Sequence, residues 1–188
     1  MNVNLLSIQI GHPQTYWDEQ GSWETAFFKE PVSGPIFLDS LGLKGDAVGN
    51  SQHHGGLDQA VLLYAAEHYA RWQTELGQEL PFGGFAENLT VSGLDETTVC
   101  IGDIYQIGPV KLQVTKSRIP CWKISRRWGI PDLTKRATQT GRTGWYCRVL
   151  QTGEIEAGMP IQILEQSTSG ETIAQSFQAY LHKKEDVT

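Results

Sequence analysis

One cysteine in a short basic segment has the residue type and the surroundings for chemistry. The segment 116–123 reads KSRIPCWK, so Cys121 follows a proline and lies between cations. The proline fixes its own φ and keeps the residue before it extended, which presents the thiol on a stiff stretch of chain. A thiolate is the reactive form of cysteine, and a nearby Arg118 or Lys123 favours that form. The segment predicts a nucleophile or a metal ligand, although a buried cysteine beside a solvated basic loop has the same pattern.

Basic side chains gather around this cysteine. Between positions 111 and 148 there are ten basic residues and one acidic residue, Asp132, so this segment carries a formal charge of +9. The whole chain has a net charge of −6, which leaves −15 on the remainder. A basic block of this kind suits an anionic partner, either a phosphate-bearing cofactor or a nucleic acid. Because the acidic remainder opposes binding to a duplex, we expect a small anion and no nucleic acid, with a solvated basic face as the alternative.

Two glycine-rich turns carry the other polar candidates. In the first, His54 precedes Gly55 and Gly56, and the glycine pair allows a sharp turn and a close approach of the backbone to a ligand. Adjacent histidines cannot easily face one metal, so this turn does not predict a zinc site, and a packed histidine with Asp58 capping local backbone is the alternative. The second turn, at positions 81–90, opens onto polar side chains that could hydrogen-bond a ligand: Glu87, Asn88 and Thr90.

The elements that must position these residues are mostly short strands. Alternating or continuous apolar runs predict short strands at positions 2–10, 23–27, 35–38, 61–64, 99–107 (with a turn at 102–103), 110–114, 145–150 and 161–164. A change of phase at Leu5 is typical of a β-bulge. Helical spacing of Tyr69 and Trp72 predicts a core-facing helix that stops at Gly77. A second short helix begins at Pro131 and ends at Gly141 or Gly144. Positions 11–21 have the composition of a polar loop.

The end of the chain predicts one further helix. Positions 168–171 have a capping-box pattern, and an apolar stripe follows on one helical face: Ile173, Phe177, Tyr180 and Leu181. We expect this stripe to pack on the body of the protein or on a second subunit, as in a homodimer. The predicted organisation is a mainly β domain at 1–166, closer to a barrel than to a layered α/β fold, and a helical tail at 167–188.

The composition sets the broad class of the protein. The chain has 188 residues, of which 39% are hydrophobic and 19% charged, as in ordinary soluble globular domains. Neither a signal peptide nor an apolar run of bilayer length is visible, so we expect no membrane association. Three widely spaced cysteines argue against a disulfide framework and for the reducing cytoplasm.

Six stretches in this order resemble one family. They are GP with LGLKGD at 34–46, HGGLDQAV at 54–61, EHY at 67–69, ENLT at 87–90, IGD at 101–103 and RIPCWK at 118–123. Together they look like a MOSC domain, the molybdenum-cofactor sulfurase C-terminal type, and the nearest branch is the YiiM-like, hydroxylaminopurine-resistance branch. The resemblance covers most of the chain, from position 26 to position 164.

This resemblance implies a MOSC-type β-barrel that holds molybdenum cofactor (molybdopterin), with a cysteine as the protein ligand to molybdenum. The implied activity is a detoxifying reduction of N-hydroxylated compounds, including hydroxylaminopurine bases, independent of pyridoxal phosphate. Electrons would come from a flavin or iron–sulfur reductase. Ala86 stands where the family usually has glycine, and the long members continue through several C-terminal helices where this chain has one.

The family pattern also assigns roles to individual residues. The metal ligand falls on Cys121, which with His54 and Asp58 would be catalytic. The cofactor would be bound by a larger set: Cys121, Arg118, Lys123, Asn88, Glu87, Thr90, Gly55 and Gly56. A soft thiolate suits molybdenum already bound by dithiolene sulfurs. Arginine offers a bidentate fork for the cofactor phosphate, for which Arg126 and Arg142 are further candidates.

Three other functions are compatible with the same residues. The protein could be a sulfur carrier that holds a persulfide on Cys121 for metal–sulfur cofactor assembly without binding molybdenum. It could be a hydrolase in which Cys121, His54 and Asp58 form a nucleophilic triad, provided that the fold brings them together. It could also be an anion-binding module without catalytic activity. Binding of the cofactor by the purified protein distinguishes the first of these from the molybdenum enzyme.

Overall fold

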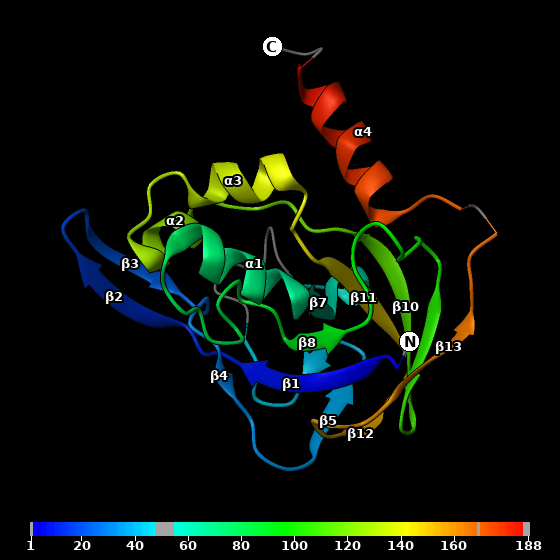
Figure 1. Ribbon diagram of the computed structural model, residues 1–188. Coiled ribbons are helices and arrows are strands. Elements are labelled where there is room, and N and C mark those ends of the chain that lie inside the picture. Colours follow the sequence, from blue (N-terminus) through cyan, green and yellow to red (C-terminus); the bar gives the residue numbers. More distant parts are fainter. Residues whose placement is uncertain (1, 48–54, 169, 186–188) are drawn as a thin grey trace.

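The computed structural model describes residues 2–47, 55–168 and 170–185 (Figure 1). Its body is an eight-stranded sheet with strands in this spatial order: β13 (Ile161–Glu165), β9 (Ile104–Ile107), β10 (Val110–Ser117), β11 (Trp145–Gln151), β7 (Val61–Ala65), β8 (Leu89–Ser92), β1 (Asn4–Ile10) and β4 (Glu30–Pro31). Neighbouring strands are antiparallel, except for the parallel pair β7 and β8. Parallel strands need a crossover, and helix α1 (Glu67–Leu76) lies within it.

The predicted mainly β class is confirmed, but the strand pairing described here does not close the sheet into a barrel. Backbone hydrogen bonds nevertheless connect β1 with the segment that leads into β13. The Leu5 amide donates to the Met159 carbonyl at 3.0 Å, and the Gly158 amide donates to the Leu5 carbonyl at 2.6 Å. The register of β1 against β8 shifts between Leu5 and Ser7, which confirms the predicted bulge.

Two small sheets flank the main one. In the first, β5 (Ile36–Asp39) lies between β12 (Gly153–Ile155) and β6 (Gly42–Leu43); in the second, β2 (Gln14–Asp18) pairs with β3 (Gly21–Thr25). The prediction of a polar loop at 11–21 was therefore wrong. The strand β2 forms because Tyr16 pairs with Trp23 across the hairpin and stacks on Phe28 with ring centroids 3.8 Å apart. Such aromatic partners stabilise a strand whose own residues are mostly polar.

Three helices gather on one side of the sheet (Figure 1). They are α1, α2 (Lys123–Trp128) and α3 (Leu133–Thr140), and the short 3₁₀ helix η1 is formed by Leu57–Gln59. Gly77 and Gly141 cap α1 and α3 in the left-handed region, which confirms the predicted stop at Gly77 and selects Gly141 over Gly144 as the stop of the second helix. Helix α2 was not predicted. Tyr69 and Trp72 of α1 are buried in an aromatic cluster beneath these helices, as expected from their spacing.

The last helix, α4 (Ile173–Glu185), projects away from the body toward the C-terminus (Figure 1). Its capping box is one turn later than predicted, because the Thr172 hydroxyl accepts from the Gln175 amide while the Gln175 side chain accepts from the Thr172 amide. Ile173 and Phe177 are buried in the body, whereas Tyr180 is 41% exposed. Among the described residues, none of the helices is both long enough and apolar enough to cross a bilayer.

Candidate functional site

A cavity of about 580 Å³ opens where several loops meet beside the sheet. Its walls come from five parts of the chain: 25–29, 39–47, 55–62, 86–88 and 118–123, together with Tyr146 of β11. Most of the candidate residues that the structure describes line it: Cys121, Arg118, Lys123, Asn88, Gly55 and Gly56. The fold therefore brings together segments that are up to about 100 positions apart in the sequence.

Cys121 lies in the cavity wall immediately before α2 and is partly exposed. Its carbonyl accepts hydrogen bonds from the Ile124 amide at 3.1 Å and the Thr134 hydroxyl at 3.0 Å. Helix α3 thus fixes the backbone that carries the thiol. Pro120 stiffens the approach from the other side, as the sequence predicted.

Arg118 is the most unusual charged group of the cavity. It is 5% exposed, and its Nη1 is buried without a hydrogen-bond partner among the described residues. No described carboxylate forms an ion pair with it, and the Phe27 ring lies 6.0 Å from its Cζ. A buried donor of a charged group without a partner is costly, so an anion that accepted from this Nη1 would be stabilised. The cavity that it lines is the place where such an anion would bind.

The other arginines considered for the phosphate have protein partners. Arg126 forms an ion pair with Asp18 and donates to the Gly21 carbonyl, and Arg142 pairs with Glu75. Neither is a lining residue of the cavity as described. Arg118 and Lys123 therefore remain as the candidates for anion binding.

An ion pair that the sequence did not reveal lies in the same cavity. The side chains of Lys29 and Asp46 are 8% and 11% exposed, and the Lys29 Nζ is 2.5 Å from Asp46 Oδ1. Asp46 also accepts from the Gly11 amide at 2.7 Å and from Asn88 Nδ2 at 2.8 Å. Burial lowers the pKa of the Lys29 ammonium, and Asp46 opposes this effect. Asp46 belongs to the LGLKGD stretch, which could have indicated it, but no local pattern singles out Lys29.

The buried side chain of Glu87 holds the turn at 83–90 together through hydrogen bonds. This buried carboxylate accepts from the Gly83 amide at 2.7 Å, the Phe85 amide at 3.2 Å, the Thr90 hydroxyl at 2.9 Å, and the Tyr69 hydroxyl. Four hydrogen bonds satisfy its oxygens within the protein. Glu87 and Thr90 are not lining residues of the described cavity and support its wall from behind.

Two residues of this turn do reach the cavity. The side chain of Asn88 donates from Nδ2 to Asp46 Oδ2, and its Oδ1 accepts from the Leu62 backbone amide at 3.1 Å. Asn88 therefore holds two cavity segments together. Ala86 has a φ of 64°, in the left-handed region that favours glycine. This alanine thus has a backbone conformation that is typical of glycine.

The remaining candidates are placed differently. Asp58 is on η1, where its carboxylate pairs with Arg148 Nη2 at 2.8 Å, and it is not a lining residue of the described cavity. Gly55 and Gly56 line the cavity with φ of 92° and 87°. His54 lies outside the described residues. No triad of Cys121 with a histidine and Asp58 is formed by the residues that the structure describes, and the catalytic roles of these residues stay predictions.

Tyr146 is a lining residue that sequence reasoning missed. Burial raises the pKa of its phenol, the Arg118 guanidinium lowers it, and Cys121 raises it. Both groups are therefore close enough to Tyr146 to act on it electrostatically. The alternation in β11 predicted a strand, but it could not indicate which of its faces meets the cavity.

The chain is similar to known proteins in sequence and in structure. Residues 50–162 match the model of the MOSC domain. Protein YiiM of Escherichia coli is 33% identical over 162 residues, which are 85% of this chain and 71% of that protein. A protein of Gibberella moniliformis named "Reductase" is 40% identical over 149 residues, which are 77% of this chain and 26% of that protein.

A solved structure agrees with the sequence comparison. The crystal structure of YiiM from Geobacillus stearothermophilus aligns with a TM-score of 0.80 at 34% identity, covering 97% of this chain and 85% of that one. The family model covers the cavity segments 55–62, 86–88 and 118–123 and Tyr146, whereas the segments 25–29 and 39–47 precede it. The chain belongs to the MOSC domain family, in its YiiM-like branch.

Proposed function

We propose that this protein is a molybdenum-cofactor-dependent reductase of N-hydroxylated compounds, with Cys121 as the protein ligand to molybdenum. One observation carries the proposal: the buried Arg118, whose Nη1 has no hydrogen-bond partner among the described residues, lines the same cavity as Cys121. The MOSC family membership and the relative named "Reductase" support the same reaction class.

The lining residues fit the chemistry of the cofactor. Arg118 and Lys123 would hold its phosphate, because an unpaired guanidinium offers two parallel donors to an anionic group. The Cys121 thiolate would ligate the metal, since soft sulfur ligands suit molybdenum bound by dithiolene. Gly55 and Gly56 leave room for a flat pterin to approach the backbone. The bound cofactor would supply two-electron redox chemistry.

The reaction also needs protons, which the chain can supply. Conversion of an N–OH group to N–H with release of water consumes two electrons and two protons. The Lys29 ammonium faces this cavity, and burial makes it a stronger acid than an exposed lysine. Asp46 keeps the ammonium in place, and Asn88 keeps Asp46 in place. We assign proton donation to the Lys29–Asp46 pair.

The proposal includes the wider setting of the enzyme. Its substrates would be small N-hydroxylated molecules such as hydroxylaminopurine bases, and a flavin or iron–sulfur reductase would deliver electrons. The setting would be the cytoplasm, which is compatible with three free cysteines. The bonds between the start of β1 and residues 158–159 would be part of a closed barrel. A homodimer would use the exposed end of the α4 stripe at Tyr180.

Metal and pterin analysis of protein made in a cofactor-producing host tests this function. We expect about one molybdenum and one pterin per chain, and reduction of hydroxylaminopurine with a suitable electron donor. Arg118→Ala should lose most of the bound pterin, whereas Arg126→Ala, which removes an arginine paired with Asp18, should retain it. Protein without molybdenum that carries a persulfide on Cys121 would favour the sulfur carrier instead.

A further inference from the structure

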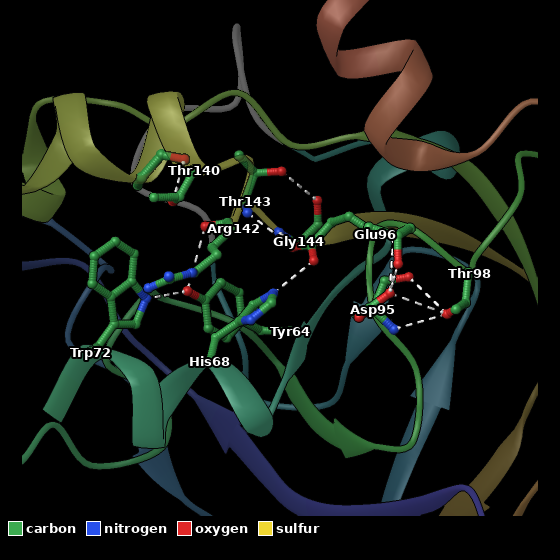
Figure 2. A network of polar contacts seen from close by, with 12 residues as sticks. Tyr64, His68, Trp72, Asp95, Glu96, Thr98, Thr140, Arg142, Thr143 and Gly144 are labelled. Carbon is green, nitrogen blue, oxygen red and sulfur yellow. Dashed lines mark hydrogen bonds and ion pairs between the residues drawn. The ribbon is translucent and has the colours of Figure 1, made fainter. Parts of the chain in front are cut away.

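A buried carboxylate lies behind the anion site and does not touch the cavity. Glu96 is 3% exposed, and its Oε1 accepts from the Thr143 amide at 2.9 Å and the Gly144 amide at 2.7 Å (Figure 2). Its Oε2 is 2.6 Å from Nε2 of His68 on α1. One side chain therefore ties the turn at 142–144 to helix α1.

The same turn holds Arg118. The Gly144 carbonyl accepts a hydrogen bond from the Arg118 amide at 3.1 Å, immediately after the point where β10 and β11 pair through Ser117 and Trp145. Gly144 has a φ of 77°, and a Cβ there would collide with the Leu63 carbonyl. The turn has little freedom to move, and the amide of Arg118 is fixed relative to Glu96 through a single glycine.

Other contacts hold the turn from the opposite side. The Tyr64 hydroxyl donates to the Arg142 carbonyl at 3.4 Å and accepts from Trp72 Nε1 at 2.8 Å (Figure 2). The Arg142 guanidinium lies over the Trp72 ring and pairs with Glu75. Glu96 is the member of this network that directly accepts from the Gly144 amide, so two hydrogen bonds through Gly144 connect it to the Arg118 backbone.

We infer that Glu96, oriented by His68, is a positioning residue of the anion site, which sets the Arg118 guanidinium in the cavity through Gly144. The inference rests on the proposed function, because it takes Arg118 as the anion-binding group. In this role Glu96 acts through the length of its side chain, which lets it accept from both the Thr143 and the Gly144 amide, and not through its charge. Its negative charge alone would weaken anion binding, so charge and position predict opposite effects when Glu96 is changed.

Alkylation of Cys121 in the cofactor-free protein tests this inference. Iodoacetate is an anion and iodoacetamide is neutral. The rate of alkylation by iodoacetate divided by the rate of alkylation by iodoacetamide therefore reports the positive potential at the thiol. Mass spectrometry of the peptide that contains Cys121 isolates this thiol from the other cysteines. Arg118→Ala should lower the ratio roughly fivefold, the order expected for loss of one nearby charge at a partly buried site.

The Glu96 variants separate reach from charge. Glu96→Ala and Glu96→Asp should lower the ratio toward that of Arg118→Ala, because neither side chain spans to both amides. Glu96→Gln keeps the reach and should not lower it. Asp103→Ala is the matched control, since Asp103 is also buried and accepts from two backbone amides, those of Cys100 and Ser167, but does not line the described cavity. It should leave the ratio unchanged.

The outcomes are distinguishable. A ratio that rises or stays constant in Glu96→Asp, or that falls equally in Asp103→Ala, overturns the positioning role. If Glu96→Ala does not fold, Glu96→Asp carries the test, because it keeps a buried carboxylate. An Arg118→Ala ratio equal to that of the unmodified protein would remove the anion site itself. Failure to find molybdenum, with the expected order of ratios intact, would count against the proposed function and leave the role of Glu96 standing.

Discussion

At the scale of single residues, the three cysteines differ in what surrounds the sulfur. Cys121 is partly exposed in the cavity wall, whereas Cys147 on β11 is fully buried, and burial raises the pKa of its thiol. Cys100 lies outside the strands, in an isolated bridge to Thr172. The same substitution should therefore have a different consequence at each position.

Cys121→Ser should fold with a loss of about 1 kcal/mol in the free energy of unfolding, bind the pterin weakly and be inactive toward N-hydroxylated bases. Cys147→Ser buries a hydroxyl in the core and should cost about 1–3 kcal/mol while retaining activity. Cys100→Ser should retain most of the stability and most of the activity. Denaturant titration and a reductase assay measure the two effects separately. Equal activity of the Cys121 variant and the unmodified protein would remove Cys121 from the site.

Ala86 is a second position where one residue sets local geometry. Its φ of 64° is unfavourable for alanine, so Ala86→Gly should stabilise the fold by about 1 kcal/mol. Ala70→Gly, at an exposed position inside α1, is the control and should lose about 1 kcal/mol. Chemical denaturation of both variants checks the opposite signs. A loss of stability in Ala86→Gly would show that the backbone strain inferred here is absent.

At the scale of elements, the β2–β3 hairpin is tied to α2 by one ion pair. Arg126 donates to both oxygens of Asp18 and lies over the rings of Trp23 and Trp122. Trp122 directly follows Cys121 in the sequence. The hydrogen bond from Arg126 lowers the pKa of Asp18 below its ordinary value of 3.8. A pair that spans the hairpin and α2 links the edge of the cavity to a segment far away in the chain.

This lowered pKa gives the pair a defined dependence on pH. Because the pKa of Asp18 is lower in the folded than in the unfolded protein, its stabilising effect is complete above pH 3.8 and is lost as the pH falls through the folded-state value. Asp18→Asn should thus be modestly less stable at neutral pH, and its denaturation curve should converge with that of the unmodified protein in acid. Arg126→Ala should behave likewise. A constant difference at all pH values would contradict this origin.

The start of helix α4 is anchored to the body. Ile173 and Phe177 are 0% and 1% exposed, and the amides of Ile173 and Ala174 donate to carbonyls of Val99 and Glu96. Phe177→Ala should cost about 3–5 kcal/mol in unfolding free energy. Tyr180→Ala, at a position 41% exposed, should change the stability of the monomer little but weaken any dimer that uses this face.

Denaturation and analytical ultracentrifugation measure these two effects, and truncation after Gln166 should combine them. A truncated chain as stable and as associated as the full chain would show that α4 contributes neither to the core nor to assembly.

At the scale of the whole molecule, many of the basic residues between positions 111 and 148, the basic block, interact with other parts of the protein. Four arginines of this block pair with carboxylates: Arg126, Arg136, Arg142 and Arg148. Arg127 donates to the carbonyls of Phe27 and Gly83. What reaches the cavity from this block is the smaller set of Arg118 and Lys123, which suits a small anion.

The protein should therefore not bind arbitrary duplex DNA tightly. The net charge of −6 opposes the duplex field, and four arginines of the basic block already have carboxylate partners that compete with phosphate. Fluorescence anisotropy with a labelled duplex at physiological salt checks this expectation, with inorganic phosphate as a competitor. Tight binding that weakens steeply as salt rises would contradict it.

The sequence by itself determined those features that depend on neighbours along the chain. A continuous apolar run predicted β7, alternating or mostly apolar runs predicted β10 and β11, and the change of phase predicted the bulge at Leu5. The stops at Gly77 and Gly141 followed from the left-handed freedom of glycine. The segment around Cys121 also indicated its chemistry from residue types alone. Periodicity and backbone conformation are local, so a single sequence contains them.

Only the tertiary structure decided which charges are free. Arg118 and Arg126 are eight positions apart in one basic segment, yet Arg126 is paired with Asp18, 108 positions away, while Arg118 is buried without a described acid. The Lys29–Asp46 pair and the cavity face of Tyr146 depend in the same way on which loops meet. Electrostatic partners are set by distance in space, and a local pattern carries no information on that distance.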